Sequence, residues 1–254
     1  MNTGTTLDGS ANVLFAANSL GNSGTINVND FELNAVSMNI DGEGSITNLT
    51  MNNNDGAVIL NTQTITGSLT LQVGKIFATG TGKIIIDQNA TITGGSASSY
   101  IAGNLQRYAA NSNPLTFDIG DVDTYNPLTV TPNLITGGGI LASTEAGDHF
   151  DIANSGINEN RSVNRTWSLE NAGAVFYDYI VDFNWQSPDV DQGANTSAFI
   201  VSKYDQGGFP TEWEVLVSSA QTPTSISAFY PGPSMSDFQI GEASECIVTI
   251  PDAN

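Results

Sequence analysis

The sequence predicts an all-β protein, with an N-terminal parallel β-helix (a β-solenoid) followed by an antiparallel β-sandwich. Three observations lead to this prediction. Short runs of Val, Ile and Leu recur through residues 56–103. Gly, Asn, Asp, Thr or Ser closes each run, as expected for strands that are joined by tight turns. Longer alternating strands that contain aromatic residues follow in the second half of the chain.

The apolar runs, such as residues 58–60, 69–73 and 84–86, are too short for helices, which need about ten residues at a 3.6-residue period. The segments between them are too short and too poor in helix formers for βαβ units. A coil of strands and turns that stacks on itself satisfies both constraints. Gly67 and Gly74 fall between runs, where a tight corner favours a residue with positive φ.

The first 55 residues show the same character with less regularity. Apolar and polar residues alternate in residues 24–28 and 36–40, which is the period of a half-buried strand. We interpret this segment as the first coils of the same solenoid. Because the end of a solenoid is a sheet edge that needs a cap, an irregular start is expected.

The composition changes near residue 104. All three tryptophans and most of the tyrosines lie in the second part of the chain, in longer strands such as residues 176–185. Pro-containing turns separate these strands. We therefore predict a β-solenoid over residues 1–104 and a β-sandwich over residues 105–243. Residues 244–254 are predicted to be the start of a following module or a linker.

The net charge is strongly negative, with 26 Asp and Glu against 6 Lys and Arg, which gives a formal charge of −20. Binding a phosphate backbone requires Lys and Arg, so nucleic acid is excluded as a partner and an anionic membrane surface is disfavoured. No stretch approaches the roughly 18 apolar residues of a membrane span, so we expect no membrane insertion. The many carboxylates are instead ligands of the kind that Ca²⁺ prefers.

The single cysteine, Cys246, excludes an intramolecular disulfide framework. We interpret it as a small buried hydrophobic residue near the end of a module, with an intermolecular link as the alternative. Residues 1–4 lack the basic region and the apolar core of a signal peptide. The chain is then either cytosolic or a mature fragment of a secreted protein, and the Asn, Thr and Gly composition favours the second.

Three carboxylates, Asp118, Asp121 and Asp123, are the candidate metal ligands, in a predicted loop. Alternating oxygens at this spacing can surround Ca²⁺, whose six to eight ligands often include backbone carbonyls. The alternative is that the same side chains cap turns and are solvated. Asp189 and Asp191 form a second candidate pair of the same kind.

Four aromatic residues, Trp185, Tyr204, Trp213 and Tyr230, are candidates for binding a ligand by stacking on sugar rings. They lie in or near the strands and turns of the predicted sandwich. Packing in the core of that sandwich is the alternative for each of them.

The chain contains few catalytic side chains. The only histidine, His149, has no Ser or Cys in a nucleophile elbow near it, and one histidine excludes a multi-histidine metal centre. We interpret His149 as a surface or hydrogen-bonded loop residue. Carboxylates within the solenoid are few and are not concentrated on neighbouring coils, as a polysaccharide lyase or hydrolase would need. We therefore expect that the chain is not an enzyme.

Five short motifs together resemble a known layout. They are Gly-Ser-Leu-Thr-Leu-Gln-Val-Gly-Lys-Ile at 67–76, Ser-Tyr-Ile-Ala-Gly-Asn-Leu-Gln-Arg at 99–107, Phe-Asp-Ile-Gly-Asp at 117–121 with Tyr-Asn-Pro-Leu-Thr-Val at 125–130, Asn-Arg-Thr-Trp at 164–167, and Phe-Gln-Ile-Gly at 238–241. This layout is similar to that of secreted surface proteins of Bacteroidetes that the type IX system exports. Asp118 departs from the Pro that is usual in the third motif. The resemblance covers about residues 56 to 243.

The resemblance implies a large modular adhesin or surface-layer protein at the cell surface, without catalytic residues in this part. The implied partners are other modules of the same protein, surface glycans and other cells. We therefore expect a non-catalytic structural or adhesive module, with Ca²⁺ as the candidate stabilising ion. The alternatives are a carbohydrate-binding module and a β-helix polysaccharide-active enzyme. A trimeric phage fibre is also compatible with the solenoid.

Overall fold

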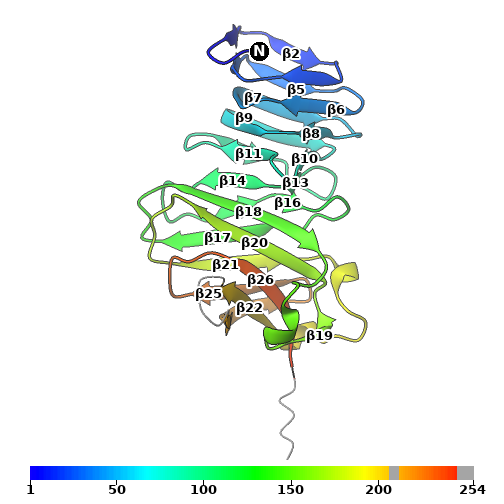
Figure 1. Cartoon of the computed structure of the whole chain (residues 1–254), viewed down its shortest axis with the longest axis vertical. Helices are drawn as coiled ribbons and strands as arrows, with labels where there is room; N and C mark the ends of the chain where they lie inside the picture. The colour runs from blue at the N-terminus through cyan, green and yellow to red at the C-terminus, as the bar shows by residue number, and fades with distance from the viewer. Residues whose placement is uncertain (206–211, 245–254) are drawn as a thin grey trace, which may run out of the picture.

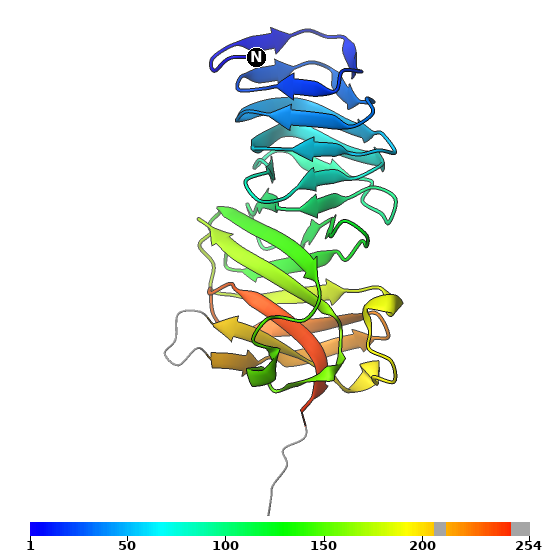
Figure 2. The ribbon, with the colours of Figure 1, turned by 45° about the vertical axis from the view of Figure 1, so that its right-hand side comes forward.

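The computed structural model describes residues 1–205 and 212–244. Within these ranges the chain is all-β, and parallel strands stack into a β-solenoid of about six turns. The prediction of an all-β fold with a β-solenoid is therefore confirmed. The coils follow one another along the long axis of the molecule (Figures 1 and 2). From residue 245 onward, the predicted linker and Cys246 lie outside the described residues.

Two parallel sheets form the walls of the solenoid. The first contains β1 (Thr6–Asp8), β4 (Thr25–Asn27), β7 (Gly44–Asn52), β9 (Thr62–Val73), β11 (Lys83–Ile86) and β14 (Leu105–Tyr108), together with β2 (Asn12–Phe15), β5 (Asp30–Leu33) and β12 (Thr91–Thr93). The second contains β3 (Ser19–Gly21), β6 (Met38–Asp41), β8 (Ala57–Ile59), β10 (Ile76–Ala78), β13 (Ile101–Gly103) and β16 (Ile119–Gly120). We call β1 to β3 the first coil and β4 to β6 the second coil.

Apolar side chains stack in columns inside the solenoid. Ile26 pairs in register with Ile46, and Ile46 pairs with Ile65 on the next coil. All three are at most 1% exposed. Because side chains alternate between the two faces of a strand, the neighbouring polar residues face outward. Each column therefore removes large apolar side chains from water, which stabilises the fold by about 1.5–3 kcal/mol for each residue fully buried.

Polar side chains on the outside of the solenoid join neighbouring coils by hydrogen bonds. Asn52 Nδ2 donates to Glu32 Oε1 at 2.8 Å, and Thr50 Oγ1 donates to Asp30 Oδ1 at 2.8 Å. In both cases the donor lies 20 positions after the acceptor. Amides and hydroxyls therefore satisfy carboxylates in a part of the chain that contains few Lys and Arg.

Antiparallel strands dominate the second half of the chain. The first solenoid sheet continues through β18 (Gly139–Ala146), β20 (Arg165–Ala172), β26 (Asp237–Ala243), β22 (Phe199–Asp205), β23 (Glu212–Val215) and β19 (Ile157–Ser162). A third sheet contains β15 (Leu115–Phe117), β17 (Leu128–Asn133), β21 (Asp178–Asn184), β25 (Ser225–Tyr230) and β24 (Val217–Thr222). The helical segments of the described residues are the 3₁₀ turns η1 (Ile152–Asn154), η2 (Ser187–Asp189) and η3 (Thr196–Ala198). None of them has the length and apolarity that crossing a bilayer requires.

The first sheet changes from parallel to antiparallel pairing at β14. Leu105 of this strand pairs in parallel with Ile84 of β11 and in antiparallel with Ala142 of β18. Parallel pairing therefore extends past residue 104, where we place the predicted boundary, because β14 and β16 form one more coil. We call β14 to β16 the last coil. It belongs to the solenoid on one side and to the antiparallel strands on the other.

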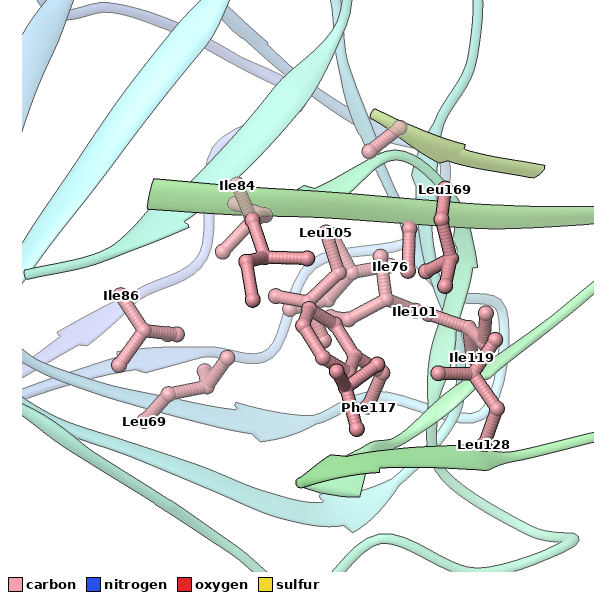
Figure 3. Close-up of a cluster of buried hydrophobic side chains, with 14 of the residues drawn as sticks. Leu69, Ile76, Ile84, Ile86, Ile101, Leu105, Phe117, Ile119, Leu128 and Leu169 are labelled. Carbon is pink, nitrogen blue, oxygen red and sulfur yellow. The ribbon is translucent and has the colours of Figure 1, made fainter. Parts of the chain in front are cut away.

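One hydrophobic core passes through both parts of the molecule. Figure 3 shows Ile101 and Ile119 of the solenoid beside Leu128 of β17. Further along, aromatic rings lie between the continued first sheet and the third sheet. Trp167 of β20 contacts Phe183 of β21 with their ring centroids 5.2 Å apart. The solenoid and the antiparallel strands therefore share buried apolar contacts as well as a continuous sheet.

Candidate functional site at the junction of the sheets

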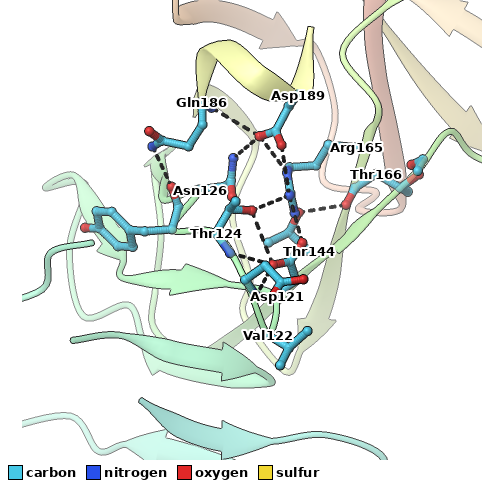
Figure 4. A network of polar contacts seen from close by, with 12 residues as sticks. Asp121, Val122, Thr124, Asn126, Thr144, Arg165, Thr166, Gln186 and Asp189 are labelled. Carbon is cyan, nitrogen blue, oxygen red and sulfur yellow. Dashed lines mark hydrogen bonds and ion pairs between the residues drawn. The ribbon is translucent and has the colours of Figure 1, made fainter. Parts of the chain in front are cut away.

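A buried arginine, Arg165, is the centre of a polar network where the last coil meets the antiparallel strands (Figure 4). It is the first residue of β20 and is only 1% exposed. Strand alternation gives Arg165 the same inward orientation as Trp167 and Leu169, which are also buried. A guanidinium in such a place requires charged or polar partners, because burial of an unpaired charge costs several kcal/mol.

Two carboxylates from distant parts of the chain bind this guanidinium. Arg165 Nη2 lies 2.8 Å from Asp121 Oδ2, in the loop that follows β16. Its Nε lies 3.3 Å from Asp189 Oδ2, in η2. The hydroxyls of Thr124 and Thr144 accept hydrogen bonds from Nη2 at 2.6 Å and from Nη1 at 3.3 Å. One side chain therefore connects the end of the last coil, β18, β20 and η2.

Asp121 accepts hydrogen bonds on both carboxylate oxygens. Its Oδ1 accepts from the backbone N–H groups of Asp123 and Thr124, both at 2.7 Å, while Oδ2 binds Arg165. Burial acts to raise the pKa of Asp121. The hydrogen bonds from Thr124, Arg165 and Asp123 and the charge of the guanidinium outweigh this effect and lower the pKa below its usual value. Asp121 is therefore an anion that the fold stabilises.

Asp189 extends the network toward the aromatic core. Its Oδ2 also accepts from Asn126 Nδ2 at 2.7 Å and from the backbone N–H of Gln186 at 3.1 Å. Asn126 is buried, and its backbone carbonyl accepts a hydrogen bond from Trp167 Nε1 at 3.4 Å. The ion pairs and the aromatic core are thus linked through a single asparagine.

A cavity of about 360 Å³ lies beside the network. Its lining includes Asp121, Asp123 and Glu145 together with the apolar side chains of Phe77 and Val122. The cavity therefore gathers acidic groups from the loop after β16 and from β18 around one hollow at the junction.

The three candidate calcium ligands have different partners. Asp118 Oδ1 accepts a hydrogen bond from the Tyr125 hydroxyl at 2.6 Å, Asp121 binds Arg165, and Asp123 is exposed. Burial and then the contact with Asp118 raise the pKa of Tyr125. Within residues 1–205 and 212–244, no group of three or more His, Cys, Asp and Glu is placed to hold a metal ion. Calcium binding by these aspartates stays a prediction.

The second candidate pair, Asp189 and Asp191, also binds other groups of the protein. Asp191 Oδ2 accepts from the backbone N–H of Ser162 at 2.8 Å, while Asp189 binds Arg165. The Ser162 hydroxyl donates to Asp148 Oδ1 at 2.7 Å. Burial and the nearby charge of Asp191 raise the pKa of Asp148, although the hydrogen bond from Ser162 opposes them. Ser162 therefore lies between two carboxylates.

The four candidate sugar-binding aromatic residues do not form one platform. Tyr204 of β22 and Trp213 of β23 are in contact, with ring centroids 5.1 Å apart. Trp185 is buried. Tyr230 lies elsewhere, with Lys203 Nζ 4.5 Å from the centre of its ring. Ligand binding by these residues stays a prediction, and the structure brings together only two of the four.

A cluster of rings around His149 was not predicted from the sequence. The His149 ring centroid lies 4.6 Å from that of Tyr204, 4.9 Å from that of Trp213 and 4.3 Å from that of Phe150. His149 is buried, and its Nε2 lies 3.4 Å from Asp237 Oδ2. Phe150, in contrast, is 82% exposed. An adjacent Phe and His in a loop were the only sequence signal for this cluster.

Arg165 was also missed as a site residue, although the sequence contains a signal for it. Arg165, Trp167 and Leu169 are alternate residues, so the arginine lies on the same face of the strand as two core residues. Its partners Asp121 and Asp189 are 44 and 24 positions away, so spacing alone does not connect them.

Comparison of the chain with protein families, with curated proteins and with solved structures finds no match. The contacts described above are therefore the basis for assigning a function. These contacts join segments that are far apart in the sequence. The charged residue at the centre of the network, Arg165, is almost inaccessible to solvent.

We predict that the Arg165→Met variant loses about 3–5 kcal/mol of unfolding free energy, because the partly buried Asp121 and Asp189, whose side chains are 14% and 11% exposed, are then left without a cation. Urea-induced unfolding measures this loss. Arg161→Met is the matched control, since Arg161 is half-buried and its hydrogen bond is to the backbone carbonyl of Gly193. Equal losses in the two variants would contradict a special role for Arg165.

A second prediction concerns acid stability. Because folding lowers the pKa of Asp121, its ionisation stabilises the fold above the unfolded-state pKa of about 3.9, and this contribution is lost as pH falls through the folded-state value. We expect Asp121→Asn to show a shallower loss of unfolding free energy below about pH 4 than the unsubstituted chain. Asp123→Asn controls for the change in net charge. If Asp121→Asn lost unfolding free energy with falling pH as steeply as the unsubstituted chain does, the prediction would be contradicted.

Proposed function

We propose that the chain is a non-catalytic structural or adhesive module of a secreted bacterial cell-surface protein. The observation that supports this most is the 15-stranded sheet, in which an unbroken order of 11 strands leads from β1 of the first coil to β23 of the antiparallel part. Backbone hydrogen bonds therefore connect the first coil to the antiparallel part within the described residues. The shared core and the Arg165 network hold the junction, where a hinge would otherwise form. Such a body keeps its two ends at a fixed separation, as a spacer or a presenting module must.

We further propose that the antiparallel strands form the predicted β-sandwich. The contact of Trp167 with Phe183 supports this, because it packs the continued first sheet against the third sheet. The contact of Phe183 with Phe238 of β26, at 5.2 Å between ring centroids, supports it in the same way. The extracellular location rests on the resemblance of the five sequence motifs to type IX-secreted surface proteins.

Small-angle X-ray scattering of the whole chain tests the rigid-module proposal. We expect one elongated body whose distance distribution is the same at low salt and at about 0.5 M salt, because the junction is held by buried contacts that salt screens little. Arg165→Met, measured below its unfolding transition, is expected to give a broader distribution. Scattering from two bodies of variable separation, or release of reducing sugars from a panel of polysaccharides, would contradict the proposal.

The ring cluster around His149 favours carbohydrate binding as a second candidate function. Phe150 combines high exposure with a neighbouring ring, since its centroid lies 5.7 Å from that of Tyr204. Exposed aromatic faces bind the apolar faces of sugars, and Asp151, which accepts a hydrogen bond from Trp213 Nε1 at 3.1 Å, adds a polar group nearby.

We predict that Phe150→Ser weakens any glycan binding of the chain by about tenfold or more, the equivalent of about 1.4 kcal/mol. A glycan array identifies the ligand, and Trp fluorescence titration then measures the affinity. Tyr177→Ser removes another exposed aromatic side chain, 68% exposed, and is expected to leave binding unchanged. No binding by the unsubstituted chain would remove this second function and leave the structural module.

A further inference from the structure

The cavity of about 360 Å³ beside the Arg165 network lies against the outer face of the second solenoid sheet. Its lining includes Phe77 of β10, Ala102 of β13 and Gly120 of β16, which pair in register from strand to strand. The loop at 121–123 and the end of β18, residues 143–146, complete this part of the lining. The cavity therefore lies where the second sheet ends and the antiparallel strands begin.

An aromatic ring on the outside of this sheet departs from the polar surface of the solenoid, where hydroxyls, amides and carboxylates join the coils. Phe77 alternates with the buried Ile76 and Ala78, so its side chain lies on the outer face. The ring is half-buried and lines the cavity. Ala102 follows Phe77 in the same column, and its short side chain leaves space beside the ring. The cavity thus has an aromatic wall.

Three carboxylates line the same cavity, those of Asp121, Asp123 and Glu145. Asp121 is an anion that the fold stabilises, while Asp123 and Glu145 are exposed. The described residues that line the cavity include no Lys, Arg or His. The cavity therefore combines an aromatic ring with negative charge, and this is the combination by which proteins bind organic cations.

The loop that carries two of these carboxylates is held by side chains of the solenoid. Lys75 Nζ donates to the backbone carbonyl of Val122 at 2.6 Å and lies 5.2 Å from the centre of the Tyr100 ring. The Tyr100 hydroxyl donates to the backbone carbonyl of Asp121 at 3.1 Å. Asp121 Oδ1 in turn accepts from the backbone N–H of Asp123. Because these contacts already order the loop, less entropy is lost when a ligand binds.

We propose that this cavity binds a small organic cation, in which an ammonium group is attached to an apolar body. The apolar body packs against Phe77, and the ammonium group lies among the carboxylates of Asp121, Asp123 and Glu145. The volume of the cavity falls within the range of about 300–1,000 Å³ that is typical of small-molecule sites. A free amine and the side chain of a lysine in a partner share this chemistry. The site does not depend on the structural role proposed above.

Benzylamine and benzyl alcohol are the matched probes, because they share a ring and a size and differ in charge. Each is titrated into the whole chain, and the amide resonances are followed by NMR. We expect benzylamine to cause saturable shifts at residues 121–123 and 143–146, and benzyl alcohol to bind about tenfold more weakly or worse, because it lacks a charge-assisted hydrogen bond. Nα-acetyl-lysine amide is the third probe, and tighter binding than that of benzylamine would indicate a lysine side chain as the natural ligand.

Three substitutions separate the parts of the site. Glu145→Gln is expected to weaken benzylamine binding by about threefold or more and to leave benzyl alcohol unchanged. Glu170→Gln is the matched control, since Glu170 is an exposed carboxylate of the neighbouring β20 that does not line the cavity. Phe77→Ala is expected to weaken both probes, because it removes the aromatic wall. A melting curve of each variant verifies that it is folded.

Three outcomes would overturn the proposal. The first is that benzylamine causes no saturable shift at residues 121–123 and 143–146. The second is that benzylamine and benzyl alcohol bind equally well, or that Glu145→Gln and Glu170→Gln have equal effects, because the carboxylates of the cavity would then have no specific role. The third is that calcium chloride alone causes the same shifts and displaces benzylamine, which would assign these carboxylates to a metal ion.

Discussion

In-register stacking of successive coils is the constraint on which the rest of the structure depends. Inward residues lie on inward residues of the next coil, as Ile46 lies between Ile26 and Ile65. A shift of one residue would turn every apolar side chain of a coil outward, so the alternation in the sequence determines the register. The outer hydrogen bonds, such as Asn52 to Glu32, require the same register. The apolar core and the outer hydrogen bonds therefore favour the same register between successive coils.

The junction meets a different requirement, because there the repeating pattern ends. Leu105 has a parallel neighbour on one side and an antiparallel neighbour on the other, so no repeat can supply the contacts beyond it. Arg165 supplies them instead, by joining a loop of the last coil to η2 through Asp121 and Asp189. A buried ion pair adds little stability compared with apolar packing, but removing one partner is costly. The network therefore favours one geometry of the junction over others.

The sequence could predict whatever depends on local periodicity. Short Ile, Val and Leu runs closed by turn residues were sufficient to predict the solenoid, because the strand period and the turn chemistry act over a few residues. The Arg165 network depends on contacts between Asp121, Arg165 and Asp189, which no local pattern relates. For the same reason, Asp121 was predicted as a calcium ligand from its neighbours, while its principal partner lies 44 positions away. The ring cluster of His149 and Tyr204 likewise joins a loop to a distant strand.

The two ends of the solenoid differ in how completely their apolar side chains are covered in the described residues. At the last coil, antiparallel strands, a shared core and buried ion pairs close the stack. At the first coil, Leu7 is 43% exposed, although Ile26, its partner on the next coil, is buried. This asymmetry follows from the same stacking that forms the core, because every coil except an end coil is covered on both sides.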